Sequence, residues 1–173
     1  YRVPGDLSED ELAFKTENVT ANVNFKSRIS DFKSNNGESM VNFPVNKYVC
    51  KIDMFKWYMD NDEIELEKTD KDVAIDSDLD LMVPNFFSVH PKQDSLSFRS
   101  NSARFSLKEK TIYCSKTAYI EVADARIYPD SMKVIIRKNA KMDKLENSAI
   151  VATFITQYHK IVNASAEITA KRA

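Results

Sequence analysis

Apolar and polar residues alternate along much of this 173-residue chain. The first clear case is residues 18–29, NVTANVNFKSRI, in which polar residues separate the apolar ones. A period of two is the pattern of a β-strand that buries one face. The sequence therefore predicts a half-buried strand, whose inward parity is that of Val19, Ala21, Val23, Phe25 and Ile29.

An Asn-Gly pair follows this predicted strand. Asn35, Asn36 and Gly37 stand between it and a second apolar stretch, ESMVNF, at residues 38–43. Asn and Gly both tolerate the positive φ of a type I′ turn, which makes Asn-Gly a strong hairpin signal. We expect a β-hairpin that pairs the two stretches.

Residues 47–59, KYVCKIDMFKWYM, carry apolar residues on both parities. Helical spacing is also present, but no good cap precedes the segment and Pro44 lies just upstream. We favour a strand that is buried on both faces over a helix. The aromatic residues of this segment are the largest apolar area in the sequence, so Phe55 and Trp57 are expected to be largely buried.

Short alternating runs fill the rest of the chain. EIELEK, DVAID and DLDLMVP come first, and from Ser95 onward follow SLSF, ARFSL, TIYC, AYIEV, ARIY, MKVIIR, AKM, AIVATFI, HKIV and AEIT. Short strands at intervals of about 8 to 12 residues are typical of sandwiches, barrels and solenoids. The predicted fold is mainly β, with short antiparallel strands in a β-sandwich, an open jelly roll or an irregular β-solenoid.

At most one or two short helices are expected in this fold. The best candidate is residues 7–15, where Ser8 can cap a helix and Glu11 occupies the third following position. The pattern divides the chain into an N-terminal β region, residues 1–94, with the Asn-Gly hairpin, and a short-strand region, residues 95–173. We expect the two to pack together as one fragment of a longer protein, because the chain opens on Tyr1 and its last run still has a strand pattern.

Charge and hydropathy argue against two classes of partner. Charged residues make up 29% of the chain and the net charge is -1, so no basic surface is available to hold a phosphate backbone. We expect no nucleic-acid partner. No apolar run approaches the roughly 20 residues that a membrane-spanning helix needs, so the chain is not expected to be transmembrane.

Glycine is scarce, at 2 of 173 residues, although β-turns commonly need positive φ. Asn and Asp residues stand at many junctions, and we expect them to adopt that conformation instead. One acidic run suggests a cation site at first, but it lacks the glycine and the closing Glu of a calcium loop. A solvent-facing strand with a turn is the favoured interpretation of this run, which comprises Asp70, Asp72, Asp76, Asp78 and Asp80.

No catalytic motif is found in the sequence. Cys50 and Cys114 each share the parity of neighbouring apolar residues, which predicts small inward-facing side chains; a disulfide between them is the alternative. His90 and His159 show no zinc-ligand spacing. We therefore predict no catalytic residue, no metal site and no cofactor.

The second half of the chain repeats a phrase in which a small or polar residue precedes alanine, as in NSARF, VADARIYP and KNAKM. With the strands around it, NSARFSLKEKTIYCSKTAYIEVADARIYPDSMKVIIRKNAKM resembles the short-strand repeats of the organic-solvent-tolerance family, the lipopolysaccharide-transport jelly rolls of bacterial envelopes. It is also similar to large uncharacterised exported proteins of Bacteroidetes-like bacteria. The resemblance covers less than half of the chain.

This resemblance implies both a fold and a role. In the organic-solvent-tolerance family the strands form an open, twisted jelly roll whose interior carries acyl chains, and subunits pair edge strands end to end. By that resemblance we expect a module of the periplasm, the cell surface or the secreted fraction, with neighbouring modules or envelope proteins as partners and lipid as a candidate ligand. The residues expected to line the apolar interior are Ile112, Ile120, Val122, Ile127, Val134 and Ile136.

Two classes of function fit these patterns. The favoured one is a non-catalytic module that acts as a scaffold, an interaction unit or a carrier of an apolar ligand, because the inward parities are apolar nearly throughout. The alternative is a carbohydrate-acting enzyme domain that uses the acidic loop residues. The C-terminal strand around Ala166 to Ile168 is expected to be an unpaired edge that a neighbour can extend.

Overall fold

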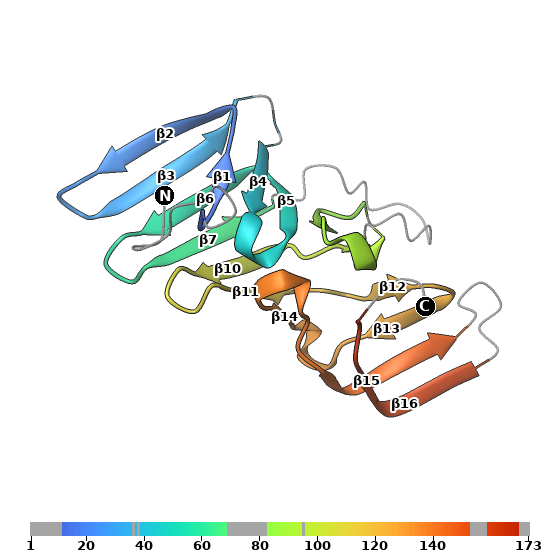
Figure 1. Ribbon diagram of the computed structural model, residues 1–173. Coiled ribbons are helices and arrows are strands. Elements are labelled where there is room, and N and C mark those ends of the chain that lie inside the picture. Colours follow the sequence, from blue (N-terminus) through green and yellow to red (C-terminus); the bar gives the residue numbers. More distant parts are fainter. Residues whose placement is uncertain are drawn as a thin grey trace, which may run out of the picture.

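The computed structural model describes residues 12–35, 37, 39–68, 83–94, 96–152 and 159–169. Two antiparallel β-sheets enclose one apolar core (Figure 1). The helices of the described residues are 3₁₀ turns of three residues: η2 Pro44–Asn46, η3 Pro91–Gln93, η4 Asp130–Met132 and η5 Lys138–Ala140. The predicted mainly β fold of sandwich type is confirmed.

The two sheets differ in size. The nine-stranded sheet has the order β1-β4-β5-β8-β9-β12-β13-β15-β16, and the seven-stranded sheet has the order β14-β11-β10-β7-β6-β3-β2. The strands of the first are Lys15–Thr16 (β1), Ser39–Phe43 (β4), Tyr48–Ile52 (β5), Phe86–Ser88 (β8), Ser97–Phe98 (β9), Ile120–Val122 (β12), Ala125–Tyr128 (β13), Leu145–Ala152 (β15) and His159–Ala166 (β16). Those of the second are Val19–Asn24 (β2), Ile29–Ser34 (β3), Met54–Tyr58 (β6), Glu63–Glu67 (β7), Ser102–Ser106 (β10), Thr111–Ser115 (β11) and Val134–Ile136 (β14).

Apart from the single strands β1 and β14, the chain forms these strands as hairpins that alternate between the two sheets. The hairpin β2–β3 belongs to the seven-stranded sheet, β4–β5 to the nine-stranded sheet, and β6–β7 to the seven-stranded sheet again. Each new hairpin pairs with the previous hairpin of its own sheet. Strands from the two predicted regions, residues 1–94 and 95–173, are therefore neighbours in both sheets. β7 pairs with β10 in one sheet, and β8 pairs with β9 in the other.

The mixed parity of residues 47–59 marks one of the crossings between sheets. Tyr48, Cys50 and Ile52 are buried from the nine-stranded sheet, and Phe55 is buried from the seven-stranded sheet. Asp53 separates the two strands. The choice of a strand over a helix is confirmed. The single strand buried on both faces is wrong, because apolar residues change parity where the chain changes sheets.

The predicted Asn-Gly hairpin is also wrong. Residues 18–29 do not form one strand, since β2 and β3 pair with each other around a turn at residues 25–28. β3 then pairs with β6 and β4 pairs with β5, in different sheets. Gly37 does have a positive φ of 91°, but the chain changes sheets between β3 and β4 instead of closing a hairpin.

Some predicted elements fall on residues outside the described ranges. Of the predicted helix at residues 7–15, residues 12–15 are described, and they are not helical. The prediction is wrong there because an extended segment lets Ala13 and Phe14 pack into the core, with the Phe14 ring edge-on to Phe55 at 6.2 Å. DVAID and most of DLDLMVP, like the acidic run within them, lie outside the described residues.

Residues other than glycine adopt positive φ at 14 described positions. Asn and Asp residues account for six of them: Asn18, Asp62, Asp94, Asn139, Asn147 and Asn163. The remainder include Lys47, Lys110 and Lys116, which stand next to strand ends. The expectation is therefore confirmed in part, and at the other positions the geometry of the turn overrides residue preference.

Aromatic side chains fill much of the space between the sheets. Phe43 and Phe105 approach from opposite sheets, with ring centroids 4.8 Å apart. Phe55 is 2% exposed and stacks on Phe32 at 4.4 Å, which confirms its predicted burial. Trp57 is half-buried, because it lies nearer to the end of the sandwich.

Asn46 links the two sheets along one side of the sandwich. Its side-chain amide is buried and donates hydrogen bonds to the carbonyl oxygens of Lys110, at 2.9 Å, and Ile136, at 3.3 Å. Asn46→Ala is expected to lower the free energy of unfolding by about 1–3 kcal/mol, because partly or fully buried carbonyls lose their donor. Urea unfolding measures this loss, and an unchanged midpoint would contradict it.

Candidate functional site

The six residues predicted to line an apolar interior lie in the core. Ile112, Val134 and Ile136 belong to the seven-stranded sheet and Ile120 and Ile127 to the nine-stranded sheet; all are buried. Val122 is partly buried and packs against the same core. A ligand could touch the buried residues only by displacing packed side chains, so the middle of the sandwich is closed.

The nine-stranded sheet becomes progressively uncovered toward β16. Its inner face carries a row of isoleucines, one opposite the next on neighbouring strands: Ile120, Ile127, Ile150 and Ile161. Ile120 is fully buried, Ile150 is half-buried and Ile161 is 52% exposed. The seven-stranded sheet ends at β14, so it does not extend over β15 and β16 (Figure 1). We call the surface formed by Val122, Ile150 and Ile161 the C-terminal ledge.

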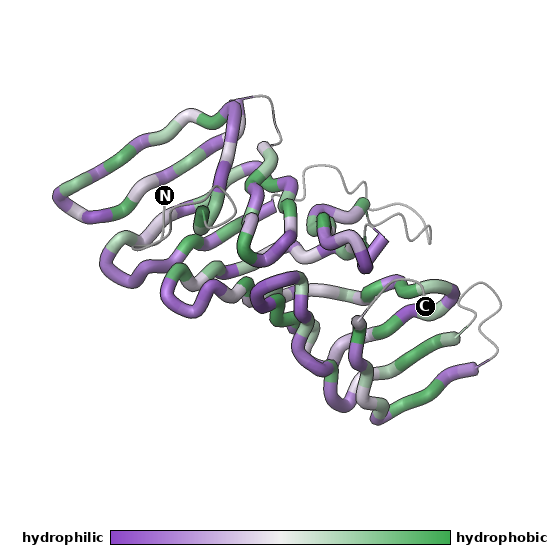
Figure 2. Tube along the Cα trace, viewed as in Figure 1, coloured by the Kyte–Doolittle hydropathy of each residue, from purple (hydrophilic) through white to green (hydrophobic). Residues whose placement is uncertain are grey.

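The seven-stranded sheet becomes uncovered at its opposite end. One inner-face row runs through Ile112, Phe105, Ile64, Trp57, Ser30 and Val23. Ile112 is fully buried, Trp57 is half-buried and Val23 is 41% exposed. We call the surface formed by Val19, Val23, Phe32 and Trp57 the N-terminal ledge. The β2–β3 hairpin and the β15–β16 hairpin lie at opposite ends of the molecule (Figure 1), and Figure 2 shows hydrophobic residues along both.

Two sheet edges at the C-terminal end differ in accessibility. The free edge of β14 is covered by the following residues, because Arg137 N–H donates to the Lys141 carbonyl at 2.7 Å and Asp143 N–H to the Ile135 carbonyl at 2.9 Å. The Arg137 guanidinium also holds Asp143 through two hydrogen bonds of 2.6 and 2.7 Å. The edge of β16 is the last of its sheet, and within the described ranges no strand pairs with it.

The predicted C-terminal edge coincides in part with the edge strand β16. Ala166 ends β16 and pairs with Leu145, and Ile168 is 6% exposed in the core. Ala166 therefore lies in the edge strand, as predicted, whereas Ile168 lies beyond the end of β16 with its side chain in the core. The side chains of this edge strand are exposed from His159 to Asn163.

Some titratable groups in the described residues have hydrogen-bond partners within the fold. His90 Nδ1 accepts a hydrogen bond from Lys92 N–H at 3.2 Å and so caps η3, while His159 is exposed at the start of β16. Ser165 and Lys144 hydrogen-bond to Glu146 and lower the pKa of its carboxyl group. Within the described part of the chain, no cluster of three His, Cys, Asp or Glu side chains is arranged to hold a metal ion.

Both cysteines are free thiols in the core. Cys50 lies on β5 of the nine-stranded sheet and Cys114 on β11 of the seven-stranded sheet, and both are buried. Burial, and secondarily the Coulombic influence of Cys114, raises the pKa of the Cys50 thiol; burial also raises that of Cys114. The inward-facing prediction is confirmed, and the alternative of a disulfide is not what the structure shows.

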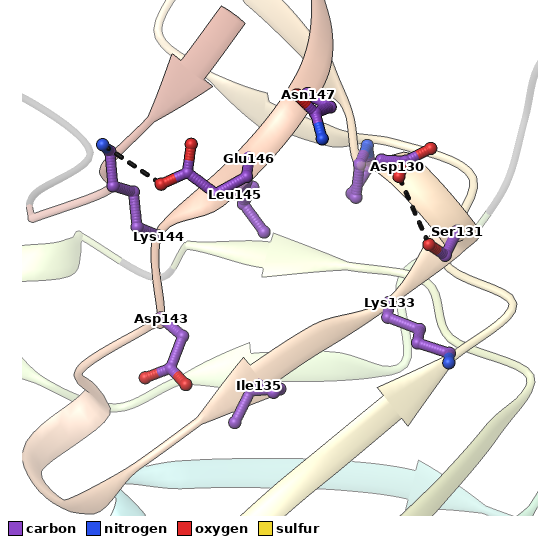
Figure 3. A pocket seen from close by; sticks show the side chains of 10 residues that line it. Asp130, Ser131, Lys133, Ile135, Asp143, Lys144, Leu145, Glu146 and Asn147 are labelled. Atoms are coloured by element: carbon purple, nitrogen blue, oxygen red, sulfur yellow. Dashed lines mark hydrogen bonds and ion pairs between the residues drawn. The ribbon is translucent and has the colours of Figure 1, made fainter.

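A polar hollow of about 220 Å³ lies where β14 and β15 diverge into different sheets (Figure 3). Its charged side chains are largely engaged with one another. Lys144 pairs with Glu146 at 3.1 Å, and Asp143 is held by Arg137.

Comparison with models of known protein families finds no family that matches the chain. Comparison with curated proteins finds no relative of the sequence. The described part of the structure contains no helix with the length and hydropathy to span a membrane.

Proposed function

We propose that this chain is a non-catalytic β module of a bacterial envelope or secreted protein, and that it acts as a scaffold by packing against a neighbouring module. The observation that carries this proposal is the opposite offset of the two sheets. One sheet leaves the N-terminal ledge uncovered and the other leaves the C-terminal ledge uncovered. A neighbour in the same orientation would therefore place its N-terminal ledge over the C-terminal ledge of this module.

The energetics of burial favour such stacking. Full burial of an isoleucine or valine side chain is worth about 1.5–3 kcal/mol, and Ile161 and Val23 each keep a large part of that area exposed. Both ledges are apolar and they lie at opposite ends of the module. One contact between two modules therefore removes one ledge of each module from water. The contact is heterologous, which means that it repeats along a chain of modules.

The exposed edge of β16 adds backbone hydrogen bonds to the proposed contact. Strand addition to a free sheet edge supplies main-chain hydrogen bonds, and the side chains beside it supply selectivity. The β14 edge is already covered by residues 141–143, so the neighbour would extend the nine-stranded sheet only. Neighbouring modules of the same chain or other envelope proteins are the partners we propose.

Carriage of an apolar ligand, such as a lipid, is the second candidate function. It is favoured by the partly exposed isoleucines of the C-terminal ledge and by the resemblance to lipopolysaccharide-transport repeats. The closed middle of the sandwich confines such a ligand to the two ends. The carbohydrate-acting enzyme has no support from the described residues, since the acidic run on which it depends lies outside them.

Stacking is tested with two charge substitutions and a matched control. The unmodified chain is expected to associate as its concentration rises, and Ile161→Lys and Val23→Lys are each expected to suppress association, because either one places a charge on a ledge. Val89→Lys is the control, since Val89 is 51% exposed, about as much as Ile161, but lies on neither ledge. Sedimentation velocity over a concentration series measures the effect.

A mixture of the two ledge variants separates stacking from other modes of association. Each variant keeps one intact ledge, so the mixture is expected to form dimers that do not grow further. The emission of Trp57, the single tryptophan, reports whether the N-terminal ledge becomes covered. A monomeric unmodified chain at high concentration, or equal suppression by Val89→Lys, would contradict the proposal.

A further inference from the structure

The outer face of the seven-stranded sheet carries a second hollow, which is lined mainly by polar and charged residues, unlike the apolar ledges. Its volume is about 370 Å³, and its main lining residues are Glu67, Ser102, Arg104, Tyr113, Ser115 and Lys133. These residues come from β7, β10, β11 and the residue just before β14. The outer face is not part of either ledge, so the stacking proposed above leaves it free.

The strand register explains why a hollow forms at this place. Ser102 lies opposite Ser115 on one side and opposite Glu67 on the other. The two short serine side chains therefore lie between two long charged ones, Glu67 on one side and Lys133 on the other. Lys133 lies next to Ser115 because Val134, the residue after it, pairs with Cys114. The next outward row, Glu65, Arg104 and Tyr113, forms a tall wall beside the serines.

The wall residues are held in place without any ligand. The Arg104 guanidinium donates to Glu63 and lies over the Tyr113 ring, 4.6 Å from its centroid. The Tyr113 hydroxyl donates in turn to Glu109. Side chains that are ordered before binding lose little conformational entropy when a ligand arrives.

The floor of the hollow is formed by strands whose other face is packed in the core. The inward neighbours of its strands, Leu66, Ala103 and Cys114, are buried in the core. The Ser115 hydroxyl donates to the Ser102 carbonyl oxygen at 3.1 Å, which joins the two central strands beyond their ladder. A binding surface on central strands is held more accurately than one on a loop.

The chemistry of the lining selects a class of ligand. The lining carries two carboxylates, Glu65 and Glu67, and two cations, Arg104 and Lys133. Since Arg104 is already paired with Glu63, an anionic ligand gains little net attraction. The lining offers acceptors, donors and hydroxyl groups that do both, beside the Tyr113 ring, one face of which is covered by the Arg104 guanidinium. Sugar hydroxyls also donate and accept, and the C–H faces of a sugar pack against aromatic rings. We propose that this hollow binds a neutral carbohydrate.

Titration of the full chain with a panel of neutral oligosaccharides built from glucose, mannose, galactose or N-acetylglucosamine tests this site. At least one is expected to bind saturably with a dissociation constant of about 1 mM or below, as measured by NMR shifts of the Tyr113 and Ser102 amides. Ser102→Leu fills the hollow and is expected to weaken binding at least tenfold. The control is Ser97→Leu, because Ser97 is a half-buried serine on the other sheet.

Tyr113→Ala provides a second test, one that leaves the hollow unfilled. It removes the ring under Arg104 and is expected to weaken binding at least tenfold. Its thermal unfolding midpoint is expected to be no lower than that of Ser97→Leu. Absence of saturable binding by every neutral oligosaccharide overturns the proposal. Retained binding in Tyr113→Ala and Ser102→Leu, or saturation by inorganic phosphate at the same amides, overturns it as well.

Discussion

Phe55→Ala is expected to lower the free energy of unfolding by about 3–5 kcal/mol. The Phe55 ring is 2% exposed, stacks on Phe32 at 4.4 Å and meets the edge of Phe14 at 6.2 Å. Its removal takes the apolar area of the ring out of the core and leaves a cavity that these neighbours cannot fill without moving. Chemical denaturation followed by circular dichroism measures the change.

Phe25→Ala is the matched control for this prediction. Phe25 lies at the turn between β2 and β3 and is 80% exposed, so its loss is expected to change the unfolding free energy by less than about 0.5 kcal/mol. Both variants remove the same atoms, and only burial distinguishes them. Equal unfolding midpoints for the two would show that Phe55 does not pack as the structure describes.

Alkaline pH is expected to destabilise the fold through its two buried thiols. An unfolded thiol ionises near pH 8.5, whereas burial raises the pKa of Cys50 and of Cys114 in the folded chain. Their contribution is complete below about pH 8.5 and is lost as the pH rises toward the folded pKa. The free energy of unfolding is therefore expected to fall as the pH rises through that range.

The double variant Cys50→Ala with Cys114→Ala isolates this term. It lacks both titrating groups, so its unfolding free energy is expected to fall less steeply between pH 9 and pH 11 than that of the unmodified chain. Burial also raises the pKa of Tyr48, which adds a loss of the same sign above about pH 10 in both proteins. Urea unfolding at several pH values gives the two slopes, and equal slopes would contradict the prediction.

The closed core and the two open ends have different consequences for function. Ile112, Ile120 and Ile136 stabilise the middle of the sandwich by full burial, and they leave no space there for a ligand. Ile161 and Val23 contribute little to the isolated fold because each remains partly in water. A contact with a neighbour would therefore bury the most additional apolar area at these residues.

Substitutions at these two kinds of position should therefore separate folding from assembly. A change at Ile112 acts on the unfolding midpoint, and a change at Ile161 acts on the sedimentation coefficient at high concentration. Ile168 belongs to the first kind, since it returns to the core after β16. A charge at Ile168 is accordingly a test of stability and not of edge pairing.

Local sequence pattern was sufficient to predict most strands of the second half. TIYC, ARIY and HKIV correspond to β11, β13 and part of β16, because alternation with a period of two reports directly which side chains face inward. The same reasoning placed Cys50 and Cys114 in the core. It also predicted the absence of long helices, since no extended run in the described residues has helical spacing with good caps.

The partner of each strand could not be predicted from the same pattern. Alternation shows that a strand has one buried face, but the side chains that cover it come from distant parts of the chain. Asn-Gly therefore indicated a hairpin wrongly, and the mixed parity around Asp53 concealed a change of sheet. The hollow around Ser102 and Ser115 was missed for the same reason, because these serines are neighbours only through the strand register.

The sequence by itself determined the β class of this protein, the inward faces of many of its strands and the chemical balance that leaves it with almost no net charge. These properties depend on residue type and on spacings of two or three positions. Tertiary structure alone decided the alternation of hairpins between two sheets, the closed middle and the opposite ledges at the ends. Those features depend on which strands pair and on where each sheet stops, and such long-range pairings are set by the packing of the whole chain.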